Sequence, residues 1–136
     1  MRSIRIVRML SVVGLATGLT LAGGVARAAD DPPEAVLQHE LDALKSRSYT
    51  AFVADGTDEV RSGLTATMFE GVANMVAPRL EGGYHKKYLT SLRQRGLMVY
   101  LWKLEFSDGK DDMLVRLSMS TSPSTKGAKI AGILLQ

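Results

Sequence analysis

The chain contains no cysteine, and this absence excludes several kinds of chemistry. Disulfides, thiolate metal ligands and cysteine nucleophiles are all ruled out. A lipid anchor attached at an export cleavage site is ruled out too, because that attachment needs a cysteine. Without cross-links, the folded part must be held by its hydrophobic core alone, and its length of roughly 100 residues suits one domain rather than two.

Histidine is nearly as scarce, since His39 and His85 are the only two. Two isolated histidines do not make a zinc-binding pattern. Asp108, Asp111 and Asp112 lie close together, but they lack the ligand spacing of a calcium loop. The sequence also has no Gly-x-Ser-x-Gly elbow and no phosphate-binding glycine loop. It therefore predicts no metal site, no cofactor and no catalytic residue.

The N-terminal segment has the three-part pattern of a secretory signal. Arg2, Arg5 and Arg8 are followed by an apolar stretch at 9–22, and small residues precede a cleavage position after Ala28. The stretch is shorter than the about 20 apolar residues that a membrane-spanning helix needs, and glycine and threonine dilute it. We therefore expect a signal peptide over 1–28, a single domain over 29–136, and a secreted or periplasmic product that does not contact the membrane after cleavage.

The excess of positive over negative charge lies in this predicted signal. The whole chain has 17 basic and 14 acidic residues, and four of the arginines lie before the cleavage position. The remainder has 13 basic against 14 acidic residues, a net charge of −1. A nucleic-acid partner is not expected, because no basic surface remains.

Helical periodicity dominates the first half of the predicted domain. Leu37, Leu41 and Leu44 recur at the spacing of one helix face, and Thr65 stands at a capping position before another apolar stripe. Pro78 should end or kink that later helix just before itself. Helices or helical turns are predicted over 32–45, 49–54, 58–62 and 66–80.

The period changes to alternation after residue 83, which is typical of strands. Strands are predicted over 84–93, 97–106, 113–119 and 129–135, with a tight turn at Asp108-Gly109. One face of the first strand is expected to carry Tyr84, Lys86, Tyr88, Thr90 and Leu92. Helices followed by a meander predict an α+β domain, with N-terminal helices packed on a curved four-stranded antiparallel sheet.

Several short motifs resemble a known arrangement. They are the helix start Leu64-Thr65-x-x-Met68-Phe69, the strand entry Gly83-Tyr84, the Asp108-Gly109 hairpin and the closing strand Lys129-Ile130-Ala131-Gly132-Ile133. Together they resemble small secreted domains of the nuclear transport factor 2-like superfamily, which have a cystatin-like cone of sheet around helices. The resemblance covers about residues 34–136. It implies a pocket between sheet and helices and dimerisation through the outer sheet face, but no catalytic pair of that superfamily can be matched here.

Amphipathic aromatic residues on the strands are the candidates for ligand binding. Tyr84, Tyr88, Tyr100 and Trp102 are expected either to line a pocket or to form core. In particular, Tyr100 and Trp102 should pack on the helix that carries Phe69.

A non-enzymatic exported domain is the leading functional hypothesis. It would bind a small apolar ligand or a partner protein and form a homodimer, with an outer sheet face around Val99 and Leu101 as the contact. An acid–base enzyme is the first alternative, and it needs His85, Glu70 or Asp55 in the pocket. A structural or assembly role is the second.

Overall fold

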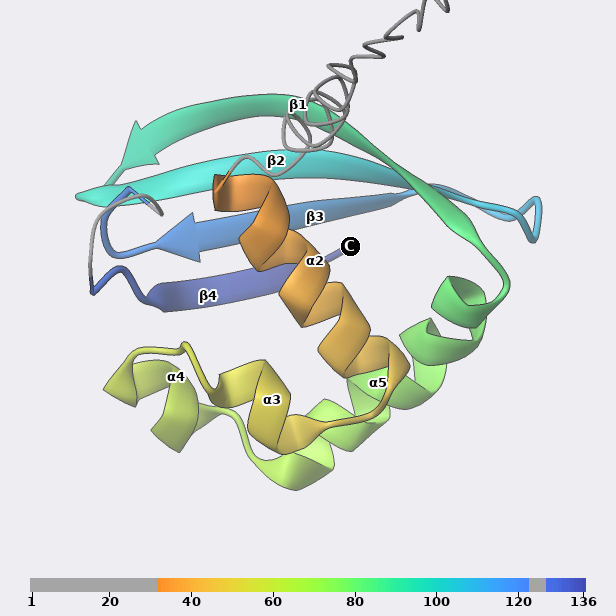
Figure 1. Cartoon of the computed structure of the whole chain (residues 1–136), viewed down its shortest axis with the longest axis horizontal. Helices are drawn as coiled ribbons and strands as arrows, with labels where there is room; N and C mark the ends of the chain where they lie inside the picture. The colour runs from red at the N-terminus through yellow and green to blue at the C-terminus, as the bar shows by residue number, and fades with distance from the viewer. Residues whose placement is uncertain (1–31, 123–126) are drawn as a thin grey trace, which may run out of the picture. The chain divides into compact units, whose positions relative to one another are not determined.

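The helices precede the strands along the chain, as the sequence predicts (Figure 1). The computed structural model describes residues 32–122 and 127–136, so the predicted signal lies outside the described residues. The helices are α2 (Pro32–Lys45), α3 (Tyr49–Val53), α4 (Asp58–Gly63) and α5 (Ala66–Glu81). The strands are β1 (Tyr84–Gln94), β2 (Leu97–Phe106), β3 (Met113–Met119) and β4 (Ile130–Leu135). None of these helices is long and apolar enough to cross a membrane.

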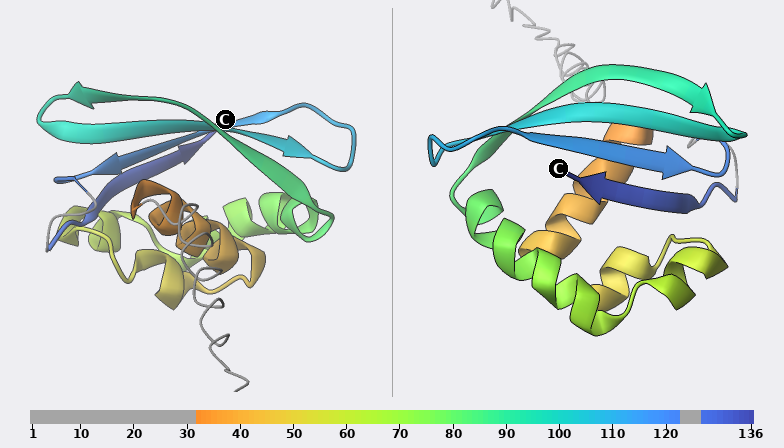
Figure 2. Two further views of the ribbon diagram at one scale, coloured as in Figure 1. Left: turned by 45° about the horizontal axis from the view of Figure 1, so that its top comes forward. Right: turned by 180° about the vertical axis from the view of Figure 1, so that it is seen from behind.

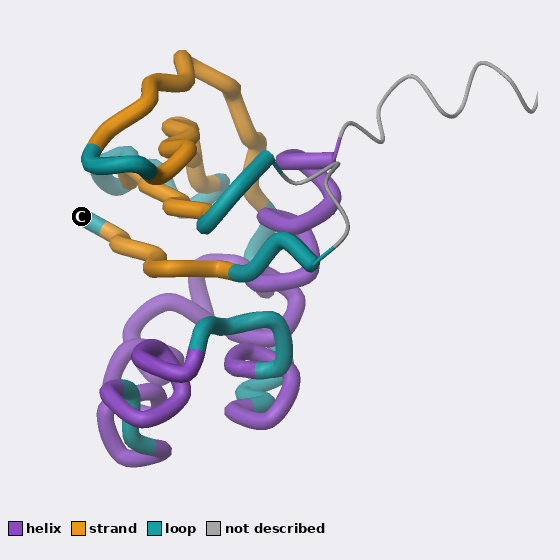
Figure 3. Tube along the Cα trace, turned by 90° about the vertical axis from the view of Figure 1, so that its left-hand side faces the viewer, coloured by secondary structure: helices purple, strands orange, loops and turns teal. Residues whose placement is uncertain are grey.

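The four strands form one antiparallel meander in the order β1-β2-β3-β4. The sheet curves, and the helices lie on one side of it (Figure 2). A view along another axis shows that the strand ending at the C-terminus, β4, lies next to the lower helices (Figure 3). The predicted α+β class and its helix-on-sheet layout are therefore confirmed.

Helix α2 supplies the centre of the core. Leu37, Leu41 and Leu44 have no exposed surface, and they pack in one cluster with Phe69 of α5 and Trp102 of β2. Burying each such side chain contributes about 1.5–3 kcal/mol. The helical spacing of the leucines therefore gives one face of α2 the apolar surface that covers the sheet.

The sequence predicts that the later helix ends or kinks just before Pro78. Helix α5 does not end there but continues through Pro78 to Glu81. Proline removes one helical hydrogen bond and costs about 3 kcal/mol in a helix interior. Buried side chains lie on both sides of it, at Val76, Ala77 and Leu80. Their packing keeps the last turn helical despite the missing donor.

Strand β1 contains a register shift between Tyr88 and Thr90, which pair with Trp102 and Leu101. The extra residue between them is a β-bulge, and it moves every later side chain of β1 to the opposite face. Tyr84, Lys86 and Tyr88 share one face as predicted. The prediction that Thr90 and Leu92 share that face is wrong, because the bulge puts them on the other one.

The hairpin between β2 and β3 turns at Asp108-Gly109, and Gly109 has the positive φ of 73° that favours glycine there. Asp108 Oδ1 accepts from the Lys110 backbone N–H at 2.9 Å. Arg79 of α5 donates to Asp108 Oδ2 at 2.8 Å and lies 3.9 Å from the centre of the Phe106 ring. The hydrogen bond from Arg79 holds the pKa of Asp108 below its usual value.

Candidate functional site

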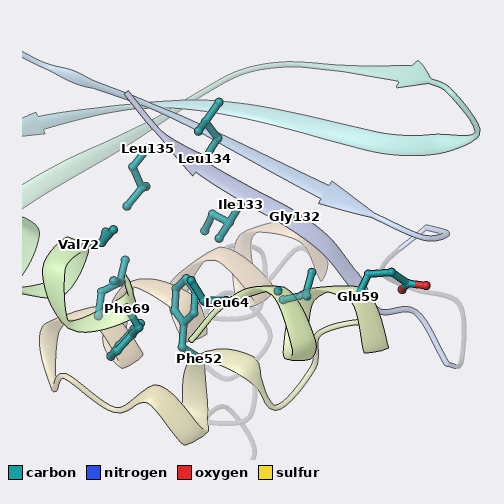
Figure 4. A pocket seen from close by; sticks show the side chains of 12 residues that line it. Phe52, Glu59, Leu64, Phe69, Val72, Gly132, Ile133, Leu134 and Leu135 are labelled. Carbon is teal, nitrogen blue, oxygen red and sulfur yellow. The ribbon is translucent and has the colours of Figure 1, made fainter. Parts of the chain in front are cut away.

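An apolar cavity of about 350 Å³ lies between β4 and helices α3, α4 and α5 (Figure 4). Its helical side is lined by Leu44, Phe52, Glu59, Val60, Gly63, Leu64, Phe69 and Val72. Its other wall is β4 itself, through the four consecutive residues 132–135. Cavities of about 300–1,000 Å³ hold small ligands, so this one has the volume of a ligand site at the lower end of that range.

Glu59 is the one ionisable residue among those that line the cavity. It is exposed, so it marks the side on which the cavity meets solvent. In Figure 4 its carboxylate points away from the apolar side chains. The interior therefore offers dispersion contacts, and the mouth carries a negative charge.

The loop before α4 attaches to the start of β4, directly before the strand residues that line the cavity. Ile130 donates its N–H to the Asp55 carbonyl at 2.7 Å and accepts from the Thr57 N–H at 2.9 Å. The Thr57 hydroxyl also caps α4 by accepting from the Val60 N–H at 3.3 Å. A Cβ on Gly56 would approach Val60 Cγ1 to 2.9 Å, so this close attachment favours glycine.

Aromatic side chains of α3 and α5 pack against one another beside the cavity. The Phe52 and Phe69 rings have centroids 5.1 Å apart, and the Tyr49 ring lies 5.9 Å from Phe69. The Tyr49 hydroxyl donates to the Leu64 carbonyl at 2.7 Å, which ties α3 to the start of α5. Aromatic pairs of this kind contribute about 0.5–1.5 kcal/mol to stability in addition to the burial of their apolar area. This aromatic side of the cavity is therefore held in place by the packing of the fold.

The four aromatic residues predicted to bind ligand lie elsewhere, on the strand pair β1–β2. Trp102 is 1% exposed and donates its indole N–H to Glu34 Oε2 of α2 at 2.9 Å. Tyr88 stands edge-on to Trp102 at 5.7 Å, and Tyr100 is buried 6.1 Å from it. Trp102 thus donates a hydrogen bond to α2, and it belongs to the same buried cluster as Phe69 of α5.

Tyr84, the fourth of these aromatic residues, belongs to a polar network that joins β1 to α2. Its hydroxyl accepts from Gln38 Nε2 at 3.0 Å. Lys86 donates to Gln38 Oε1 at 2.6 Å and forms an ion pair with Glu34 Oε1 at 2.5 Å. None of the four aromatic residues lines the cavity at β4. Tyr84 and Trp102 bond to residues of α2, and Tyr88 and Tyr100 pack against Trp102.

None of the three residues named for an acid–base enzyme lines the cavity. His85, Glu70 and Asp55 are all exposed. His39 is also exposed, with Nε2 3.2 Å from the Ala51 carbonyl oxygen. Within residues 32–122 and 127–136, no group of three or more His, Asp or Glu side chains is placed to hold a metal ion.

Glu40 of α2 is a buried ionisable residue that sequence reasoning missed. It has no exposed surface, and its two carboxyl oxygens have no hydrogen-bond partner among the described residues. Burial raises its pKa from the usual 4.5 to about 8, and the negative charge of Asp55 adds to the rise. The carboxyl group is therefore largely neutral at pH 7.

Comparisons with known proteins add no family to this description. No protein-family model, no curated protein and no solved structure matches the chain. What the structure defines is an α+β domain in which a four-stranded antiparallel meander packs on N-terminal helices. The functional argument rests on the chemistry of the cavity.

Proposed function

We propose that this protein is an exported, non-enzymatic binding module that holds a small apolar ligand or an apolar part of a partner. The observation that carries the proposal is the cavity between β4 and the helices, with an apolar lining and Glu59 at its mouth. The predicted signal over 1–28 supports export. A ligand that is neutral or positively charged at one end fits this arrangement better than an anion, because an anionic head would meet Glu59.

We also infer that the fold belongs with the nuclear transport factor 2-like domains. Helices that precede a meander, and a curved sheet with the helices on one side, support this assignment (Figure 2). A pocket between sheet and helices is what that resemblance implies. Fold likeness does not identify a ligand, so binding has to be tested on the cavity itself.

Filling the cavity is expected to abolish binding of an apolar probe. Val72→Trp places a large side chain in the cavity wall, and we expect the affinity for the neutral dye N-phenyl-1-naphthylamine to fall at least about tenfold. Fluorescence titration measures it. Met75→Trp is the matched control, because Met75 is 70% exposed on the same helix and does not line the cavity.

Circular dichroism melting shows whether both tryptophan variants fold. Equal dye affinity in the wild type and in a folded Val72→Trp variant would place the binding site elsewhere. Complete absence of dye binding to the wild type would remove the proposal.

Self-association is proposed for the outer face of the sheet. The register places Leu101 beside Arg116, and Arg116 beside Leu134, on this face. Leu134 is 48% exposed and Leu101 is half-buried. We expect light scattering to give the mass of a dimer, and Leu101→Arg to weaken the dimer at least about tenfold through an unpaired buried charge. A wild type that stays monomeric at every concentration would contradict this.

A further inference from the structure

The outer edge of β4 has unused backbone hydrogen-bonding groups beside the cavity. Leu114 and Gln136 exchange both of their backbone hydrogen bonds, at 2.7 and 3.0 Å. Such pairs alternate along an antiparallel ladder. Leu134, two residues earlier, therefore also points its backbone to β3, whereas Ile133 and Leu135 point theirs to the free edge. Within the described part of the chain, no hydrogen bond reaches those two residues from that side.

The two edge strands of the sheet, β1 and β4, differ in whether they discourage pairing with another strand. Charged or polar side chains and bulges on an edge strand discourage pairing with a further strand. β1 has both devices, since it carries Lys87 and Arg93 and its bulge follows Tyr88. β4 has the sequence Ile-Ala-Gly-Ile-Leu-Leu, without a charge, a proline or a polar side chain. The free part of β4 is therefore open to strand addition.

The cavity adjoins this same stretch of β4. The loop before α4 already occupies the edge at Ile130, where Gly56 forms a parallel bridge. Beyond that bridge, residues 132–135 line the cavity while Ile133 and Leu135 offer their backbone groups. An extended segment laid along them would have its backbone bonded and every second side chain directed into the apolar space.

We propose that the ligand of the cavity is an extended apolar peptide segment of a partner protein, which adds a fifth strand to the sheet along β4. This rests on the proposed function, because the same cavity receives its side chains. A basic residue at the end of the segment near the mouth would meet Glu59. The β4 strand of a second copy has no basic residue between Ile130 and Leu135. Its Lys129, in a symmetric antiparallel pairing of residues 132–135, would lie at the Gln136 end, away from the loop before α4 that bonds to Ile130, so the charge of Glu59 favours a different chain.

Backbone N-methylation of a probe peptide tests the strand pairing without changing the protein. The probe is a fluorescein-labelled heptapeptide, one lysine followed by alternating leucine and threonine. Two methylated versions of the peptide are made. In one frame the odd-numbered backbone amides are methylated, and in the other frame the even-numbered ones are. We expect one frame to weaken binding about tenfold or more, because it removes the donors that face β4, and the other to leave it within about twofold. Fluorescence anisotropy measures both.

Glu59→Gln tests the charge at the mouth. We expect it to weaken the lysine peptide about threefold at low salt and to leave a norleucine version of the peptide unchanged. Glu70→Gln is the matched control, because Glu70 is exposed on α5 and does not line the cavity. Equal effects of the two substitutions would remove the role of Glu59 and count against a basic segment.

The dye titration separates this proposal from the one on which it rests. If the dye binds and the two methylation frames weaken the peptide unequally, strand addition is supported. If the dye binds but the peptide does not, or both frames act equally, strand addition is overturned and the apolar ligand site stands. If neither the dye nor the peptide binds, the proposed function fails and strand addition fails with it.

Discussion

Replacing Trp102 by alanine is expected to lower the free energy of unfolding by about 3–5 kcal/mol, the usual cost of removing a buried large aromatic residue. The side chain is 1% exposed and lies at the centre of the core cluster. Its loss would open a cavity next to Tyr88 and Tyr100. It would also remove the hydrogen bond that the Trp102 indole N–H donates to Glu34 Oε2 at 2.9 Å.

Urea unfolding of Trp102→Ala measures this loss, and two further variants locate its origin. Trp102→Phe keeps most of the ring volume but removes the hydrogen bond to Glu34, so it should cost less than Trp102→Ala. Tyr88→Ala is the control, because Tyr88 is 50% exposed and should cost about 1 kcal/mol. A Trp102→Ala variant within about 1 kcal/mol of the wild type would show that Trp102 is not core.

The second large effect is a fall in stability with rising pH that comes from Glu40. Its pKa is about 8 in the folded chain against the usual 4.5. Relative to the unfolded chain, the folded chain favours the neutral carboxyl group of Glu40. The stability that this preference contributes is fully present below pH 4.5. It decreases as pH rises and Glu40 ionises in the unfolded chain, and it is lost once pH passes 8, where Glu40 also ionises in the folded chain. The slope is about 1.4 kcal/mol per pH unit, so the loss between pH 5 and 7.5 is on the order of 3 kcal/mol.

Glu40→Gln isolates this contribution, because the amide is similar in shape and does not titrate. We expect the free energy of unfolding of the wild type, measured relative to Glu40→Gln, to fall across pH 5–7.5. Glu70→Gln, at an exposed position of α5, should follow the wild type at every pH. Parallel curves for the wild type and Glu40→Gln would mean that Glu40 reaches a solvent or hydrogen-bond partner that lowers its pKa.

Glu40→Met should stabilise the domain at pH 7.5, by more than about 1 kcal/mol. The substitution keeps an unbranched side chain and removes two carboxyl oxygens that lack a partner. A buried polar group without a partner is unfavourable for folding. Glu40 lies one helical turn before Leu44, which lines the cavity, so dye binding by Glu40→Met reports whether the residue also affects the ligand site.

Local rules predicted the elements well, and they failed where packing overrode them. Pro78 is a helix breaker by local rules, but buried residues on both sides of it hold α5 together to Glu81. The alternation of β1 predicts one face for Tyr84 through Leu92, but the bulge after Tyr88 divides it. By its position in the sequence, Glu34 is an acidic residue in the first turn of a helix. In the fold it also accepts a hydrogen bond from Trp102 and forms an ion pair with Lys86.

The sequence by itself determined the order of the elements, the α+β class and the buried face of α2. These follow from periods of 3.6 and 2, which are properties of neighbouring residues. Only the tertiary structure decided where the cavity lies, because its walls come from Leu44, Phe69 and the last strand, far apart in the chain. It also decided that Glu40 is buried without a partner. Burial depends on which elements meet, and no local pattern of residues specifies that contact.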